Sequence, residues 1–145
     1  MATVDLLDVN AWLALSSTEH VHHRRARQYW MEEACPMVAF NSHTMLGLVR
    51  VSSTAPLFGG KPLSPENAWE IYLEWLQDPA VTHLSEQTNC RTYVNELVRQ
   101  GVVTAGTWSD AYLAAFAMSR QMRLVSFDRD FFRYSSLEFL HLSSS

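Results

Sequence analysis

Three aspartates that are far apart in the sequence each stand at the boundary of an apolar segment. Asp8 comes near the end of the apolar run Val4–Val9, and Asp128 follows the apolar run Arg123–Ser126. Asp110 stands in the first turn of an alanine-rich segment with helical spacing that leads into the second run. Carboxylates that share a site repel each other and raise one another's pKa, so a cation normally holds them together.

The chemistry of such a cluster follows from its ligand atoms. A set of oxygen ligands favours Mg²⁺, with Mn²⁺ as the alternative. A cation held there can activate water and neutralise the charge that develops on a phosphoryl group. We therefore predict a metal-dependent catalytic site built from Asp8, Asp110 and Asp128, with Asp130 as the nearest rival of Asp128.

Each of these acids also has a purely structural interpretation. Asp8 can simply end a strand, and Asp128 lies in a turn, where Asp is common. Asp110 stands three residues after Thr107, an arrangement similar to a capping box in which an acid stabilises the helix on its own. The prediction of a site therefore rests on the three acids taken together.

The elements that would position the acids alternate between strand and helix patterns. Short apolar runs predict strands over Val4–Val9, Met37–Phe40, Ala80–Leu84, Arg123–Ser126 and Leu137–Leu142. Helical spacing and end signals predict helices from Ala11 to the break at Ser16–Thr18, from about His20 to Glu33, from about Ser42 to Ser52, from Ser64 to Asp78-Pro79, from about Thr88 to Arg99 and from Thr107 to about Met118, with a turn or short helix over Asp128–Phe132. We expect the three serines that end the chain to be loose.

This alternation predicts one domain over residues 1–145 with an α/β fold. We expect a three-layer α/β/α sandwich around a central parallel sheet of four to five strands. In such a sheet the site lies beyond the carboxyl ends of the strands. Asp8 and Asp128 are expected at that edge.

Composition and charge limit the function classes. The chain of 145 residues is 48% hydrophobic with a net charge of −4, which argues against binding nucleic acid through a broad basic face. Only one of the 11 basic residues, Lys61, is a lysine; arginines suit a few bidentate contacts to phosphate or carboxylate. The arginines that can touch phosphates, or equally form solvated surface, are Arg24, Arg25, Arg27, Arg120, Arg123, Arg129 and Arg133.

Cysteines and the first residues indicate a cytoplasmic, soluble protein. Cys35 and Cys90 have neither a metal-ligand spacing nor a disulfide framework, which fits a reducing compartment. Met1–Ser17 lacks the basic region and cleavage site of a signal peptide, and no apolar stretch is long enough to span a membrane.

A histidine cluster invites a zinc interpretation. His20, His22 and His23 lie close together in the sequence, but no Cys or Glu completes the ligand set at a matching helical spacing. We favour roles in helix capping and at the surface for all three.

Three ordered blocks of sequence resemble the motifs of PIN-domain proteins. The blocks are Leu7–Asn10, Thr107–Ala115 and Leu124–Phe131. The resemblance is strongest to the VapC toxins of bacterial toxin–antitoxin pairs and extends over nearly the whole chain. His20–Trp30, followed later by Gly47–Arg50, is similar to one subgroup of these toxins.

The resemblance implies both a fold and a function. It implies an α/β/α sandwich and a Mg²⁺-dependent endoribonuclease that cuts RNA, is held inactive by a cognate antitoxin and forms a homodimer. In such an enzyme a water activated by the metal attacks an RNA phosphodiester. Asp8, Asp110 and Asp128 match the metal-coordinating acids of the family, while Asn10 and Ser109 match polar positions that support the acids or the metal's water.

One position departs from the family pattern. Many members carry a further acid, usually Glu, in the helix after the second strand, and Met45 stands at the matching position a few residues before Arg50. Fewer negative ligands weaken metal binding, so we expect one weakly held Mg²⁺ rather than two. The sequence leaves three consequences open. Activity survives with one metal, a polar group such as Thr44 contributes to metal binding through water, or the site is impaired. The alternative function is therefore a catalytically weak PIN-fold protein that binds RNA or an antitoxin.

Overall fold

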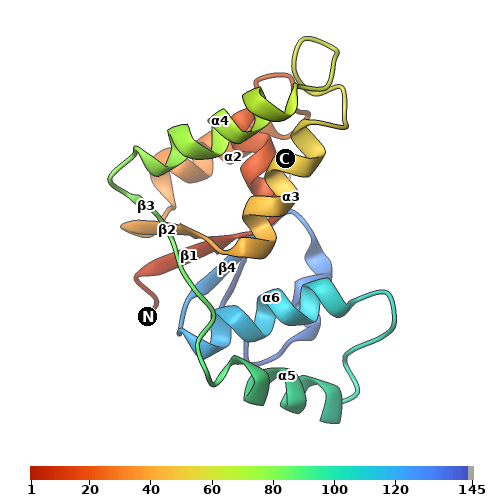
Figure 1. Ribbon diagram of the computed structural model, residues 1–145. Helices are drawn as coiled ribbons and strands as arrows, with labels where there is room; N and C mark the ends of the chain where they lie inside the picture. Colours follow the sequence, from red (N-terminus) through yellow and green to blue (C-terminus); the bar gives the residue numbers. More distant parts are fainter. Residues whose placement is uncertain (144–145) are drawn as a thin grey trace.

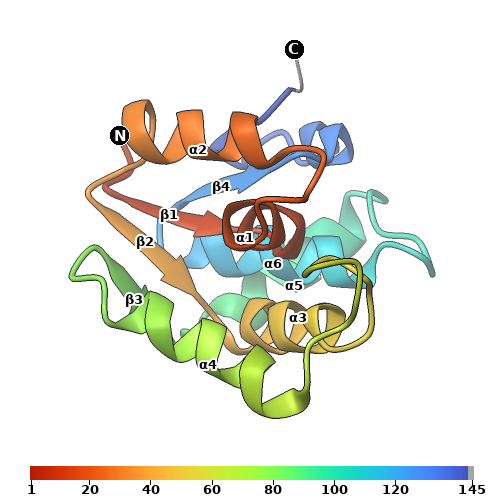
Figure 2. The same cartoon turned by 90° about the horizontal axis from the view of Figure 1, so that it is seen from above.

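The computed structural model describes residues 1–143 and contains a parallel sheet of five strands between two layers of helices (Figure 1 and Figure 2). The strands are β1 (Val4–Leu7), β2 (Met37–Phe40), β3 (Val81–His83), β4 (Arg123–Ser126) and β5 (Phe139–His141). Their order across the sheet is β3-β2-β1-β4-β5, and every neighbouring pair is parallel. The predicted sandwich is confirmed. Of the three terminal serines that we expect to be loose, Ser144 and Ser145 lie outside the described residues.

The helices divide between the two faces of the sheet. One face carries α1 (Val9–Ser16), α2 (His23–Glu32), α3 (Ser42–Ser52) and α4 (Pro65–Leu76), and the other carries α5 (Cys90–Arg99) and α6 (Trp108–Ser119). A short 3₁₀ helix, η1 (Arg129–Arg133), follows β4. No helix within residues 1–143 is both long and apolar enough to cross a membrane.

The two central strands are buried on both faces, which explains their almost continuous apolar sequences. In β1, Leu6 packs into the cluster under α5 and α6, whereas Leu7 packs into the cluster under α1 to α4. Leu124 and Val125 divide in the same way in β4, because successive residues of a strand point to opposite faces. Helix α6 presents four fully buried alanines to its cluster, so small side chains let it lie close to the sheet.

Several predicted boundaries are wrong by a few residues, for identifiable reasons. The first strand ends at Leu7 because Asp8 already serves as N-cap of α1, its carboxylate accepting a hydrogen bond from the Val9 backbone N–H. Helix α2 begins at His23 because the preceding histidines form a turn in which the His22 N–H donates to Nδ1 of His20 at 3.0 Å.

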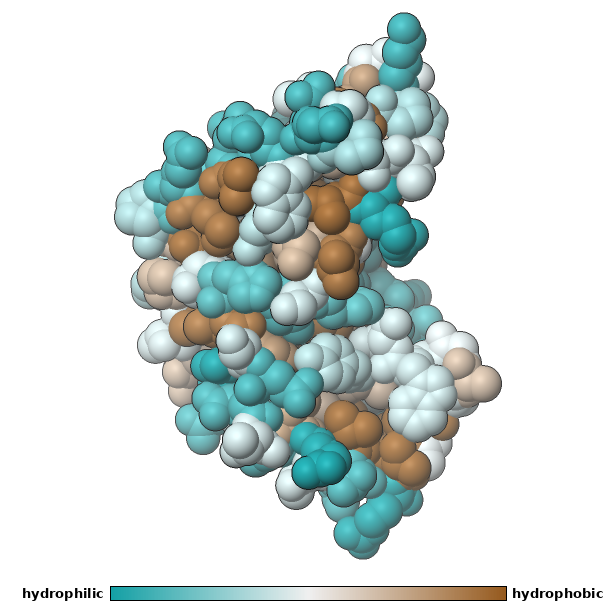
Figure 3. Space-filling view, in the orientation of Figure 1, coloured by the Kyte–Doolittle hydropathy of each residue, from teal (hydrophilic) through white to brown (hydrophobic). Residues whose placement is uncertain are grey.

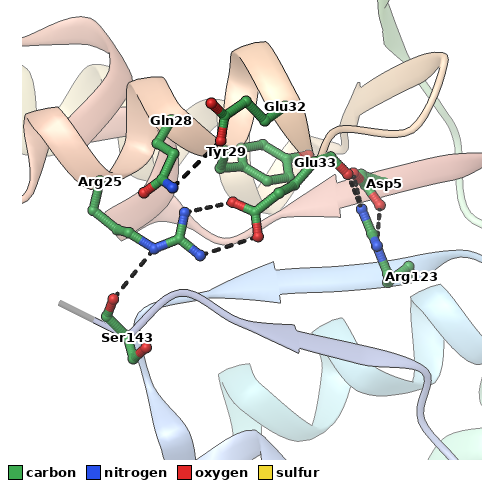
Figure 4. Close-up of polar contacts among 8 residues, drawn as sticks. All are labelled: Asp5, Arg25, Gln28, Tyr29, Glu32, Glu33, Arg123 and Ser143. Atoms are coloured by element: carbon green, nitrogen blue, oxygen red, sulfur yellow. Dashed lines mark hydrogen bonds and ion pairs between the residues drawn. The ribbon is translucent and has the colours of Figure 1, made fainter. Parts of the chain in front are cut away.

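Asp5 anchors a polar network at the amino ends of the central strands. Its side chain is fully buried, and the Arg123 guanidinium donates to its two oxygens at 2.7 and 2.9 Å (Figure 4). The Tyr29 hydroxyl and the Cys35 backbone N–H donate to the same carboxylate. Arg123 also donates to the Glu33 carbonyl oxygen at 2.8 Å. The network joins β1 and β4 to the carboxyl end of α2, and it engages the Arg123 guanidinium, which is therefore not available for a phosphate contact.

We predict that Arg123→Ala lowers the free energy of unfolding by about 3–5 kcal/mol, because it leaves a buried carboxylate without its cation. Urea denaturation measures the change. Arg99→Ala is the control: its ion pair with Glu96 is exposed at the surface and contributes at most about 1 kcal/mol. Equal losses in the two variants would contradict a stabilising role for the Asp5 network.

Candidate active site

Asp8 is fixed where β1 passes into α1. Its backbone N–H donates to the Val125 carbonyl oxygen at 2.9 Å, which continues the pairing with β4 by one residue. One carboxylate oxygen accepts from the Val9 N–H at 2.8 Å, and the other accepts from the Ser126 hydroxyl at 2.9 Å. Backbone and side chain together therefore hold this carboxylate at the carboxyl edge of the sheet.

Ser126 links Asp8 to Asp128 and is a site residue that sequence analysis missed. This last residue of β4 is fully buried, and its Oγ accepts a hydrogen bond from the Asp128 N–H at 3.0 Å while donating to Asp8. The Asn10 amide supports it, with Nδ2 donating to the same Oγ at 3.3 Å. The available signal was a hydroxyl residue at the end of an apolar run, two positions before an acid.

The geometry distinguishes Asp128 from Asp130. Asp128 is partly buried and caps η1, with one carboxylate oxygen accepting from the Asp130 N–H at 2.9 Å. Asp130 is exposed, and its carboxylate lies 3.5 Å from the Arg133 guanidinium. Asp128 is therefore the acid of this turn that is tied to Asp8 through Ser126.

Asp110 approaches the same edge from the other layer of helices, in the first turn of α6. Thr107 is the N-cap of α6, as predicted, but the capping box itself does not form: the Thr107 hydroxyl makes no cap bond to α6 and bonds instead to Thr104. Within residues 1–143, the Asp110 carboxylate accepts no hydrogen bond. Rotation of this carboxylate towards a ligand therefore breaks no hydrogen bond within the described part of the chain.

Electrostatics show that the three acids share one field. Burial is the main cause that raises the pKa of Asp8; the charge of Asp128 adds to it, while hydrogen bonds from Ser126 and Val9 oppose it. Burial followed by the charges of Asp8 and Asp128 raises the pKa of Asp110 to about 6. This mutual repulsion is the condition under which a cation binds between carboxylates.

The donor set suits a hard cation. Within residues 1–143, no three His, Cys, Asp or Glu side chains converge closely enough to hold a metal ion. All donors are carboxylate oxygens, which fits Mg²⁺ or Mn²⁺ better than zinc.

The remaining candidate residues from the sequence contribute no metal ligand in this structure within residues 1–143. Ser109 is exposed and makes no side-chain hydrogen bond within the described part of the chain. Met45 is partly buried and packs against the apolar cluster under α1 to α4, so α3 brings no carboxylate from that position. The histidines of the zinc interpretation do not form a metal site within residues 1–143: His23 bonds to the Ala14 carbonyl oxygen and His20 to the His22 N–H.

The shape of the molecule leaves this edge accessible. In Figure 3 the outline is hollowed on the right, between the layer of α1 to α4 above and the layer of α5 and α6 below, on the side towards which the strands run in Figure 2. A cavity of about 620 Å³ lies instead at the opposite, amino-terminal end of the strands, beside Thr3, Met122 and Glu138.

We predict that Asp110→Asn stabilises the metal-free protein in a pH-dependent way. Because folding raises the pKa of Asp110 from its ordinary value of 3.8 to about 6, the folded state loses stability as the pH rises through this range. The variant should match wild type near pH 4 and exceed it by about 1–2 kcal/mol at pH 7.5, a figure reduced for solvent screening. Denaturation in EDTA across this range measures the difference, with the exposed Asp130→Asn as control. A difference independent of pH would contradict the prediction.

Comparison with known proteins assigns both family and fold. The PIN domain family model matches residues 6–137. Ribonuclease VapC41 of Mycobacterium tuberculosis is 32% identical over 143 residues, which cover 92% of this chain and 94% of that protein. Ribonuclease VapC37 of the same species is 26% identical over 135 residues, covering 91% and 92%.

Solved structures with the same fold extend this result. DNA-bound VapBC from Salmonella typhimurium superposes with a TM-score of 0.68 at 18% identity, covering 99% of this chain and 100% of that one. VapC20 of Mycobacterium tuberculosis, described as a sarcin-ricin loop cleaving toxin, gives a TM-score of 0.65 at 19% identity, covering 90% and 94%. At this level of identity the similarity concerns the fold alone.

Proposed function

Because this chain belongs to the PIN-domain family and, within it, to the VapC group, we propose that it is a Mg²⁺-dependent endoribonuclease that acts as the toxin of a toxin–antitoxin pair. The observation that carries the proposal is the set of three carboxylates at the carboxyl edge of the sheet, two of them with a raised pKa. The similarity to proteins named ribonucleases over more than nine-tenths of the chain supports it.

The proposed mechanism assigns a task to each side chain. Asp8, Asp110 and Asp128 would hold Mg²⁺, or Mn²⁺, which would supply positive charge at the RNA phosphate and make water more acidic. Ser126 keeps Asp8 and the turn of Asp128 in fixed register through its two hydrogen bonds. Asn10 supports Ser126 and accepts from the Phe127 N–H at 3.4 Å.

Only some of the arginines named in the sequence analysis are available to contact RNA phosphates away from the bond that is cut. Arg120 donates to the Ser85 carbonyl oxygen, and Arg25 pairs with Glu33, so both have structural partners. Arg133 likewise lies 3.5 Å from the Asp130 carboxylate. Arg24, Arg27 and Arg129 are exposed and remain available to an RNA backbone.

The proposal includes partners and location. We propose a cognate antitoxin because similar folds from Salmonella typhimurium and Rickettsia felis were determined as VapBC bound to DNA. Leu46 of α3 and Trp69 of α4 are exposed large apolar residues that suit such a partner or the second subunit of a homodimer.

We also propose that the protein acts in the cytoplasm. The thiols of Cys35 and Cys90 are free, which fits a reducing compartment.

We predict that purified, antitoxin-free protein cleaves structured RNAs, bulk tRNA among them, with Mg²⁺ and not with EDTA. Asp8→Asn should lower the rate more than about 100-fold, since even residues that only support a metal ligand contribute about 10–100-fold. Asp78→Asn is the matched control: it changes an Asp at the other end of the sheet, and the new amide oxygen can still accept from the Ala80 N–H. Mg²⁺-dependent cleavage that Asp8→Asn retains would show the assignment to be wrong.

Met45 favours a second candidate function, a catalytically weak protein that binds RNA or an antitoxin. Under our proposal, wild type cleaves well above the Asp8→Asn background, and Met45→Glu only lowers the Mg²⁺ concentration needed for half-maximal cleavage, because an added carboxylate strengthens cation binding. Met45→Gln, of similar length and without charge, should leave that concentration unchanged. A wild type no faster than Asp8→Asn, with cleavage appearing only in Met45→Glu, would favour the second candidate.

A further inference from the structure

Helix α3 approaches the candidate active site unusually closely at Gly47. A Cβ atom at this position would lie 2.3 Å from a methyl carbon of Val9, a distance that real contacts do not allow. Val9 is the first residue of α1 and follows Asp8 directly. The missing side chain at Gly47 therefore lets α3 lie against the start of α1, immediately beside the site.

His43 lies one helical turn before Gly47, on the same side of α3. Residues four positions apart in a helix are surface neighbours, so contact of Gly47 with Val9 directs His43 towards Asp8. The charge of His43 accordingly opposes the rise in the pKa of Asp8. Its ring meets Tyr112 of α6 edge-on, with centroids 6.3 Å apart, and Tyr112 stands two residues after Asp110. The imidazole thus lies between the elements that carry two of the three acids.

The polar atoms of this imidazole are unused. Within residues 1–143, His43 forms no side-chain hydrogen bond and no ion pair, and its side chain is only partly buried. His83, at the same edge of the sheet, differs: its Nδ1 is hydrogen-bonded to the Tyr72 hydroxyl at 2.8 Å. His43 therefore has a free ring N–H beside the acids.

We propose that His43 contacts the substrate, its ring N–H donating a hydrogen bond to a phosphate oxygen of the RNA backbone next to the bond that is cut. The inference rests on the proposed function for the identity of the substrate. Three carboxylates repel a phosphodiester, and a hydrogen-bond donor beside them offsets that repulsion. Helix α3, which lacks a carboxylate at Met45, then contributes to binding of the RNA rather than of the metal.

The test measures RNA binding separately from cleavage. Each variant is made in the Asp8→Asn background, and its affinity for a fluorescein-labelled stem–loop RNA is measured by anisotropy. We expect His43→Ala to weaken binding about tenfold, the loss for one hydrogen bond to a charged acceptor, without lowering the melting temperature. His43→Gln, whose amide can still donate, should recover most of the affinity. His83→Ala, the matched control, should bind RNA as the parent does.

Each outcome has a definite meaning. Unchanged binding by His43→Ala, a Gln variant as weak as the Ala variant, or absence of binding by the parent itself would overturn the role of His43. A role limited to packing on Tyr112 would lower the melting temperature and leave RNA affinity unchanged. If wild type with intact Asp8 fails to cleave while binding still depends on His43, the proposed nuclease activity fails and the RNA contact stands.

Discussion

The pairing of β1 with β4 at the centre of the sheet fixes two polar clusters at opposite ends of the same two strands. The register sets Asp5 opposite Arg123 and Leu7 opposite Val125, and the Asp8 N–H adds one more bond to the Val125 carbonyl oxygen. A slip of one residue would part both acids from their partners on β4. It would also exchange the faces of every buried side chain between them, so the apolar core and the two clusters enforce the same register.

The two ends of this strand pair balance charge differently. Asp5 is buried, and both of its carboxylate oxygens accept hydrogen bonds from the Arg123 guanidinium. The Tyr29 hydroxyl and the Cys35 N–H donate to it as well, so this cluster stabilises the fold. At the other end, Asp8 and Asp110 have a raised pKa because burial and neighbouring carboxylates outweigh the donors present. Unbalanced charge of this kind destabilises the folded chain, and it persists where function requires it. The carboxyl end of the strand pair therefore carries the less balanced charge of the two.

The sequence predicted the architecture because local signals determine it. Buried parallel strands read as short apolar runs, and the rule that sites lie at their carboxyl ends placed Asp8 and Asp128 at one edge without knowledge of any contact. Ser126 was missed because its role depends on strand register: a serine in an apolar run does not reveal that its hydroxyl reaches Asp8, 118 positions away. The partnership of Asp5 with Arg123 was hidden for the same reason. Thr107 is the N-cap of α6 and Asp110 lies in its first turn, as the sequence predicted, but the capping box does not form because the Thr107 hydroxyl bonds backwards to Thr104.

The balance of charge at the site depends in turn on how closely α3 can approach. Only a residue without a Cβ atom fits between α3 and Val9, so Gly47 sets the distance at which any side chain of this helix acts on Asp8. At that distance the helix offers the imidazole of His43, whereas Met45 packs against the apolar cluster under α1 to α4, so neither residue adds negative charge. A site of three acids and a nearby histidine attracts a cation less strongly than a site of four acids, and it repels an approaching phosphodiester less. Under the proposed function, a helix α3 without an acid would therefore weaken binding of the metal and at the same time ease the approach of the RNA backbone.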